Sequence, residues 1–333
     1  MSHGLGGEGL GFAQVYSQYA AKVDVVLNDL IPQRPAGDPR EDILEQSMRY
    51  GVMGGGKRVR PVLALASCDL VGGDVEKAVV PAAAIELIHT YSLIHDDLPC
   101  MDDDDMRRDQ PTAHKAFGEA VALLAGDALV TYAFEVLSRP SALLPEIQLR
   151  LVHEVAEAAG CRGMVLGQVL DTITTLECQD NNESQDNNGS QDNNESQGTM
   201  ETRKRAQGLA HLERIHILKT GRLLRVSARL GALCGGCSPE QLALLTCYAE
   251  NVGLVFQIQD DILDEIGQSE NLGKNVGSDA RLGKMTYVSL LGLEEAVRQR
   301  DLALAEAERA LEFFGEKADF LWELAEFMAS RER

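Results

Sequence analysis

The chain has 333 residues, with 31 basic and 52 acidic side chains that give a formal net charge of −21. Such an acidic chain lacks the basic face that a general nucleic-acid binder needs, and it is unsuited to an anionic membrane surface. We find no run of 18 apolar residues that would span a bilayer and no secretory leader at the start, so we expect a cytoplasmic protein. Seven scattered cysteines do not make a disulfide framework, and the lone CxxC of Cys234 and Cys237 lacks the second pair that a metal site needs.

Hydrophobic spacing predicts an all-α fold, because aromatic residues are few and strong helix formers are abundant. From Phe12 to residue 30 the apolar residues recur every three or four positions, and a turn-rich linker follows at 32–39. A helix is predicted from Pro81, a residue suited to a first helical turn, to about Asp97. It carries few polar residues, so it should be buried on most sides. Further helices are predicted at 43–53, 119–137, 144–159, 209–233, 239–266 and 293–331, and we find no convincing strand.

Residues 179–197 break this pattern with a six-residue repeat, QDNNESQDNNGSQDNNESQ. The repeat has no hydrophobic residue, so it cannot bury apolar surface and is predicted to be a disordered insertion. We expect this insertion and a flexible tail at residues 1–11 to belong to a single domain that spans residues 1–333.

The first acidic cluster lies at the end of the most apolar predicted helix and reads DDLPCMDDDD, from Asp96 to Asp105. Carboxylates this close repel one another, and a hard divalent cation is their natural partner. A solvated charge run is the alternative. It is disfavoured because Asp96 and Asp97 end a buried helix.

The second acidic cluster lies in the segment FQIQDDILD, which contains Gln257, Asp260, Asp261 and Asp264. Asp260 and Asp264 are four residues apart on a predicted helix, so their side chains share one face. Two carboxylate groups on two buried helices predict opposing walls of one cavity. Since Mg²⁺ takes few protein carboxylates and completes its shell with water and phosphate, the ligand should be phosphorylated.

Basic residues support an anionic ligand. The segment GGGKRVRP at 54–61 combines glycines, which let the backbone approach an anion, with arginines, which make forked contacts to its oxygens. Further cations accompany the acidic clusters at Arg107, Arg108, Lys219, Lys274 and Lys284. A loop with surface cations is the alternative for the glycine-rich segment alone. The chain has neither a P-loop nor a dinucleotide-binding glycine motif.

Taken together, these motifs resemble those of the short-chain trans-polyprenyl diphosphate synthases. The nearest likeness is to bacterial farnesyl diphosphate synthases, followed by geranylgeranyl diphosphate synthases. The matching segments, in order, are GGGKRVRP, LIHDDLPCMDDDDMRR, LAGDALVTYAFEVL, LERIHILKTG, FQIQDDILD and LGKNVGSDARLGKMTY. The resemblance implies an all-α bundle around a central cavity and a homodimer. It also implies condensation of isopentenyl diphosphate with dimethylallyl or geranyl diphosphate to farnesyl diphosphate, by ionisation, condensation and elimination.

The resemblance also assigns roles to individual residues. Up to three Mg²⁺ ions, with Mn²⁺ as a substitute, would be held by Asp96, Asp97, Asp102, Asp260, Asp261 and Asp264. Catalysis is assigned to Asp96, Asp97, Asp260 and Lys219. The diphosphate of isopentenyl diphosphate is assigned to Lys57, Arg60, His89 and Arg108. The allylic diphosphate is assigned to Arg107, Lys219, Thr220, Gln257, Lys274 and Lys284.

Three positions bear on how far the likeness extends. Asp109 stands where the family usually has glycine, and aspartate is among the better replacements if the backbone has a positive φ there. Ser278 stands where many relatives have a lysine. Tyr91 precedes Asp96 by five residues, which corresponds to roughly 7–8 Å of helix. Its ring is predicted to form the floor that stops chain growth at the farnesyl length.

Three alternatives remain open. A geranylgeranyl diphosphate synthase would share every motif and differ in cavity depth. A terpene cyclase would keep aspartate-rich helices but has no need of the segment at 54–61. A non-catalytic partner subunit would be expected to lose aspartates from one cluster, whereas both clusters are intact here.

Overall fold

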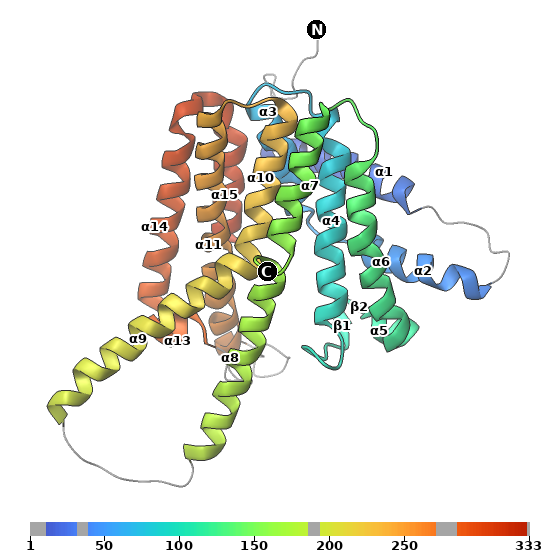
Figure 1. The fold of residues 1–333 in the computed structure, drawn as a ribbon. Coiled ribbons are helices and arrows are strands. Elements are labelled where there is room, and N and C mark those ends of the chain that lie inside the picture. Colours follow the sequence, from blue (N-terminus) through green and yellow to red (C-terminus); the bar gives the residue numbers. More distant parts are fainter. Residues whose placement is uncertain (1–10, 32–38, 186–193, 271–284, 332–333) are drawn as a thin grey trace. The chain divides into compact units, whose positions relative to one another are not determined.

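The computed structural model describes residues 11–31, 39–185, 194–270 and 285–331, and it is all-α as predicted (Figure 1). The chain forms two compact units. Unit 1 comprises Met1–Glu157, Leu223–Thr246 and Phe314–Leu321, and unit 2 comprises Ala158–Arg222, Cys247–Phe313 and Trp322–Arg333. The predicted single domain remains a prediction, and each unit is described by itself.

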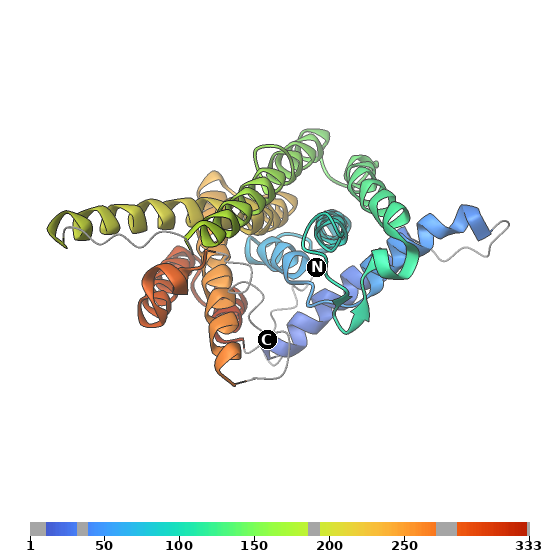
Figure 2. The ribbon, with the colours of Figure 1, turned by 90° about the horizontal axis from the view of Figure 1, so that it is seen from below.

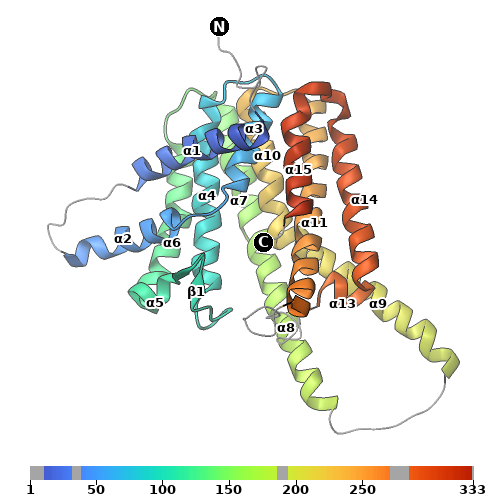
Figure 3. The ribbon, with the colours of Figure 1, turned by 180° about the vertical axis from the view of Figure 1, so that it is seen from behind.

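Unit 1 is built around one central helix, α4 (Glu76–Asp96), which packs against α6, α3, α1 and α2 (Figure 3). The other helices that lie mainly in this unit are α1 (Phe12–Leu30), α2 (Pro39–Met53), α3 (Val59–Leu70), α5 (Ala113–Phe117), α6 (Glu119–Ser138), α7 (Pro145–Ala159) and α10 (Arg222–Gly235). Burial of α4 follows from its composition, because Leu87 and Ile88 are fully buried and Glu86 is 2% exposed. The predicted burial on most sides is confirmed.

The predicted start of α4 at Pro81 is wrong, since the helix begins five residues earlier, at Glu76. A proline inside a helix removes one backbone hydrogen bond. Burial of the apolar residues before it, such as Ala78 and Val79, offsets that loss. This proline is therefore tolerated beyond the first turn of the helix.

Unit 2 contains α8 (Met164–Gln185), α9 (Asn194–His216), a π-helical turn η1 (Ile217–Gly221), α13 (Tyr287–Leu291) and α14 (Leu293–Leu311). Parts of α11 (Pro239–Glu270), of the 3₁₀ segment η2 (Glu312–Ala318) and of α15 (Asp319–Ser330) also belong to it. One of its apolar clusters joins residues of four helices, namely Leu212, Ile258, Ile262, Tyr287 and Ala296. A smaller cluster joins Val255, Ala303 and Ala329.

Two helices predicted as continuous are interrupted. The segment 209–233 contains the π-helical turn at Ile217–Gly221, and the segment 293–331 contains a kink at Gly315, where φ is 58°. In the described part of the chain, the strands are β1 (Met106–Arg107) and β2 (Gln110–Pro111), an antiparallel pair of two residues each. Neither strand is long enough to give an alternating pattern.

The repeat, residues 179–197, includes the end of α8 and the start of α9, and these two helices diverge from each other (Figure 2). Helical backbone enters the repeat from both sides, because α8 ends at Gln185 and α9 begins at Asn194. Residues 186–193, like residues 1–10 of the predicted tail, lie outside the described residues. The disorder expected there stays a prediction.

Among the described residues, α4 and α6 are long and apolar enough to cross a membrane by length and composition alone. This is weak evidence of a span, because a core helix passes the same test and 72% of the apolar window of α4 is buried.

Candidate active site

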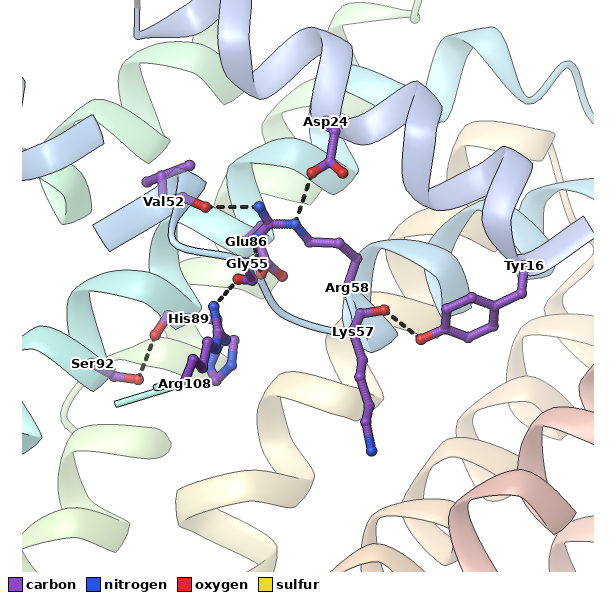
Figure 4. Close-up of polar contacts among 10 residues, drawn as sticks. All are labelled: Tyr16, Asp24, Val52, Gly55, Lys57, Arg58, Glu86, His89, Ser92 and Arg108. Atoms are coloured by element: carbon purple, nitrogen blue, oxygen red, sulfur yellow. Dashed lines mark hydrogen bonds and ion pairs between the residues drawn. The ribbon is translucent and has the colours of Figure 1, made fainter. Parts of the chain in front are cut away.

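In the glycine-rich segment 54–61, residues 54–58 form a loop and residues 59–61 begin α3 (Figure 4). Gly55 and Gly56 have φ angles of 91° and 127°, which side chains rarely adopt. A Cβ atom at Gly56 would lie 2.7 Å from the guanidinium of Arg108, and Arg108 donates a hydrogen bond to the carbonyl oxygen of Gly55. The glycines therefore let a cation from a distant loop rest against this backbone.

His89 of α4 lies beside Arg108 (Figure 4). Burial lowers the pKa of His89 well below its usual value, and the nearby charges of Arg60 and Arg108 lower it further. The imidazole is thus neutral at pH 7 and has one N–H to donate. Lys57 is exposed, and its carbonyl oxygen accepts a hydrogen bond from the hydroxyl of Tyr16. The structure therefore places three of the predicted isopentenyl diphosphate residues, Arg60, His89 and Arg108, close together.

The first acidic cluster folds back on the end of α4. The backbone N–H of Asp102 donates to the carbonyl oxygen of Asp96 at 2.9 Å, and that of Asp103 donates to Leu98 at 3.2 Å. Asp102 is exposed and Asp96 is half-buried. This turn brings two predicted metal ligands, six residues apart in sequence, close to each other.

Asp97 behaves differently from Asp96, since its side chain is only 4% exposed. The guanidinium of Arg107 donates several hydrogen bonds to the carboxylate of Asp97. Nε lies 2.7 and 2.9 Å from the two carboxylate oxygens, and Nη2 lies 2.5 Å from Oδ1. Burial alone would lower the pKa of Arg107, but the bonds and charge of Asp97 raise it. Both residues line a pocket of unit 1 together with Gly54, Thr90 and Arg108.

The hairpin of β1 and β2 presents Arg107 and Arg108. Its two central residues, Arg108 and Asp109, have φ angles of 53° and 61°. Positive φ at both positions is the pattern of a type I′ turn, which usually contains glycine or asparagine. Asp109 thus meets the condition under which aspartate is among the better replacements for glycine, a positive φ.

The second acidic cluster is also engaged by an arginine. Arg331 donates to Oδ1 of Asp260 and, at 2.9 Å, to the carbonyl oxygen of Phe256, and its guanidinium lies 3.7 Å from the centre of the Phe256 ring. Gln257 lies on the same side, with Nε2 3.5 Å from Asp260. Asp261 instead accepts a hydrogen bond of 2.7 Å from the backbone N–H of Tyr287, at the start of α13. Asp264 lies one turn after Asp260 and is half-buried.

Lys219 lies in the π-helical turn, next to the buried Thr220. Its ammonium is 2.6 Å from the carboxylate of Asp171 on α8. A Cβ atom at Gly167, one turn earlier on α8, would lie 2.3 Å from the backbone nitrogen of Lys219. Such π-helical turns occur frequently at functional sites. Here α8 supports both the backbone and the charge of Lys219.

Tyr91 is buried, with 8% of its surface exposed, and its ring meets that of His95 edge-on at 5.7 Å. Burial and the nearby Asp96 raise the pKa of its hydroxyl to about 12. Lys274, Lys284 and Ser278 lie outside the described residues, so the structure does not test them.

The donor types suit Mg²⁺, which favours carboxylate oxygen. Within the described ranges, no three His, Cys, Asp or Glu side chains converge on a single metal position. Mg²⁺ does not need such a group, because it usually takes one or two protein carboxylates and leaves the remainder to water and substrate phosphate.

Comparison with known proteins identifies the class. The Polyprenyl synthetase family matches residues 41–313. Geranylgeranyl pyrophosphate synthase 7, a chloroplastic protein of Arabidopsis thaliana, is 43% identical over 295 residues, covering 88% of this chain and 78% of that one. The solved structure of an FPP/GFPP synthase from Zymomonas mobilis is 36% identical, with a TM-score of 0.77 and coverage of 96% and 99%. That of a geranyltransferase from Legionella pneumophila is 31% identical, with a TM-score of 0.76 and coverage of 96% and 97%. The chain belongs to the polyprenyl synthetase family, a family of prenyltransferases of isoprenoid biosynthesis.

Sequence reasoning missed the partners of the predicted residues. It singled out neither Asp171, which holds Lys219, nor Arg331, which holds Asp260. Asp171 could have been noticed as an acid at the fourth position after Gly167 on an apolar helix. No pattern in the sequence connects Arg331 with residues 71 positions earlier.

Proposed function

We propose that this protein condenses isopentenyl diphosphate with an allylic diphosphate in a Mg²⁺-dependent reaction and releases farnesyl diphosphate. Family membership establishes prenyl transfer, and it favours that activity over terpene cyclisation. One observation supports the Mg²⁺-dependent reaction above all. Unit 1 contains both a basic loop beside the neutral His89 and an acidic turn at the end of α4. Both acidic clusters are intact, which disfavours a non-catalytic subunit.

The chain's own residues bind and orient the two diphosphates. Lys57, Arg60 and Arg108 would neutralise the diphosphate of isopentenyl diphosphate, and neutral His89 would donate an N–H to it. Arg107, Lys219, Thr220, Gln257, Lys274 and Lys284 would hold the allylic diphosphate. When that group leaves, an allylic cation remains, and the double bond of isopentenyl diphosphate attacks it to form the new carbon–carbon bond. The released diphosphate would then take the proton that is lost. Donors placed where charge develops on the leaving group stabilise the transition state.

Asp96, Asp97 and Asp102 of unit 1, with Asp260, Asp261 and Asp264 of unit 2, are the residues proposed to hold up to three Mg²⁺ ions, for which Mn²⁺ would substitute. When bound, the metal would supply positive charge to the departing diphosphate. The engagement of Asp97 by Arg107 favours Asp96 and Asp102 as direct ligands on their side. The engagement of Asp261 by the start of α13 similarly favours Asp260 and Asp264.

The farnesyl product is proposed because of Tyr91. Its buried ring precedes Asp96 by five residues on α4, roughly 7–8 Å along the helix axis. A chain that grows along this helix away from the diphosphate would meet the ring there. Geranylgeranyl diphosphate is the second candidate, because the Arabidopsis relative at 43% identity is named for that product.

An assay with labelled isopentenyl diphosphate and each allylic primer, with products separated by chain length, tests the proposal. We expect farnesyl diphosphate from the wild type and longer products from Tyr91→Ala. Tyr91→Phe is the matched control, since it keeps the ring and should keep the product. A wild type that already makes mainly the longer product, or a Tyr91→Ala variant without lengthening, would remove the basis of the farnesyl assignment.

We also propose a homodimer in the cytoplasm. Leu123 and Leu124 of α6 are 45% and 57% exposed, and a second copy of the chain would cover them. The described cysteines are free, as in a reducing compartment. Light scattering coupled to gel filtration would test the dimer, and a monomer at assay concentrations would contradict it.

A further inference from the structure

The glycine-rich loop contains a third cation, Arg58, that does not face the proposed ligand. Its side chain is 3% exposed, whereas the preceding Lys57 is exposed and Arg60 is half-buried. Arg58 therefore lies between two proposed substrate residues yet is turned away into unit 1.

Every nitrogen of the Arg58 guanidinium has an acceptor (Figure 4). Nε donates to Asp24 of α1 at 2.9 Å, Nη1 to Glu86 of α4 at 2.8 Å, and Nη2 to the carbonyl oxygen of Val52 at 2.7 Å. Arg58 thus ties the loop to α1, to α4 and to the end of α2. Lysine could not reproduce these contacts, because it lacks the planar fork.

The backbone of Arg58 shows that this anchoring is needed. Its φ is 52° and ψ is 31°, the left-handed region, which is unfavourable for a residue with a Cβ atom. This conformation turns the chain directly before α3 begins at Val59. The three hydrogen bonds hold the turn, and the turn sets where Lys57 and Arg60 lie.

Glu86 connects Arg58 to the helix that carries His89, because Glu86 lies one helical turn before His89 on α4. Its side chain is 2% exposed, and its charge also acts on Arg108. Glu86 is thus a buried anion at the edge of a site that must attract anions. Pairing with Arg58 neutralises it and links the loop to the helix that carries His89.

We propose that the Arg58–Glu86 pair is a positioning device for the isopentenyl diphosphate site, an inference that rests on the function proposed above. Arg58 and Glu86 touch no substrate. They hold Lys57, Arg60 and His89 in register with one another, so their loss should weaken isopentenyl diphosphate binding far more than it slows turnover at saturation.

Calorimetric titration of the full-length protein with isopentenyl diphosphate alone tests this, because no reaction occurs without the allylic partner. We expect Glu86→Gln to raise the Kd about tenfold to a hundredfold, the scale of a small misplacement of binding groups. In assays, the KM for isopentenyl diphosphate should rise while the allylic KM and kcat stay within a few-fold. Glu154→Gln is the matched control, because Glu154 forms a largely buried pair with Arg229 elsewhere in unit 1, each side chain being 14% exposed.

If Glu86→Gln fails to fold, the double variant Arg58→Met/Glu86→Leu removes both charges and leaves no buried charge behind. It should fold and still bind isopentenyl diphosphate weakly. Wild-type affinity in either variant, or equal weakening in Glu154→Gln, would overturn the positioning role. A wild type that does not bind isopentenyl diphosphate at all would instead overturn the proposed function.

Discussion

In each acidic cluster an arginine contacts a proposed metal ligand, but the two contacts differ in their separation along the chain and in the exposure of the carboxylate. Asp97 is 4% exposed and is held by Arg107, ten residues further along the same acidic loop. Asp260 is 45% exposed and is held by Arg331, near the far end of the chain. The first contact joins the end of α4 to the hairpin that follows it, whereas the second depends on the docking of a remote segment.

This difference indicates that Arg107 and Arg331 have different roles. A forked contact with a buried carboxylate orients both partners firmly. If Arg107 binds diphosphate as proposed, Asp97 would set the direction from which Arg107 approaches it. The Asp260 carboxylate is 45% exposed although Arg331 is 10% exposed, so solvent reaches the acidic side of this contact. If Asp260 holds a metal as proposed, Arg331 would occupy the carboxylate before the metal binds.

Removal of either carboxylate should have the largest effect. Asp97→Ala and Asp260→Ala are each expected to lower turnover about 10²–10³-fold, because charge stabilisation at the leaving group is lost. Both variants should also lower the melting temperature, since each leaves an arginine without its carboxylate partner, Arg107 at 32% and Arg331 at 10% exposure. Turnover at saturating Mg²⁺ and thermal unfolding measure the two effects. Asp301→Ala, in an exposed pair with Arg300, is the control. Near-normal turnover in both cluster variants would refute the proposed site.

The second prediction extends the comparison to two half-buried histidines whose pKa is lowered, His89 in unit 1 and His216 in unit 2. The pKa of His216 is lowered to about 4, because burial lowers it, Asp171 partly opposes this, and Lys219 adds to the lowering. The unfolded chain, with a pKa near 6.5, binds this proton first as the pH falls. Stability is therefore complete above pH 6.5 and declines toward pH 4, by about 3 kcal/mol at most.

His216→Phe keeps the stacking on Tyr287 but cannot titrate. Denaturant unfolding between pH 4 and 7 should show a shallower loss of stability in this variant, with the remaining slope due in part to His89. Identical pH slopes for wild type and variant would show that His216 does not titrate with folding.

A smaller effect is expected from Arg331→Gln. If Arg331 only occupies Asp260 before the metal arrives, its removal should strengthen Mg²⁺ binding by about two- to five-fold, the scale of a half-exposed ion pair. The measurement is Mg²⁺-dependent thermal stabilisation in the presence of inorganic diphosphate. Arg309→Gln, which breaks an exposed pair with Glu306, should have no effect. Weaker Mg²⁺ binding in Arg331→Gln would show instead that the arginine supports the site.

The smallest effect is expected from deletion of residues 179–197. Because the repeat contributes no apolar surface, the melting temperature should stay within a few degrees and activity within a few-fold. A large loss of either would mean that one of the two clusters depends on the insertion.

Much of the fold and the candidate site could be predicted, because apolar spacing reports which residues share a helix face and the motifs follow one another in family order. The sequence pattern did not predict the helix breaks at Ile217–Gly221 and Gly315. Each break changes the helix geometry by only a residue or so, and the apolar pattern continues across it. The pairings of Asp97, Asp260 and Lys219 escaped for another reason. Spacing along one helix carries no information about which distant side chain reaches it.

The close approach at Gly167 limits how this enzyme could be varied. Even an alanine methyl group there would collide with the backbone of Lys219, which cannot move aside as a flexible side chain would. A saturation library at this codon, selected for product formation, should return glycine almost alone. A library at Gly11, where no atom lies within 4 Å, should return many residues. The narrowest mutational tolerance in this part of unit 2 thus falls on a residue that has no chemistry of its own.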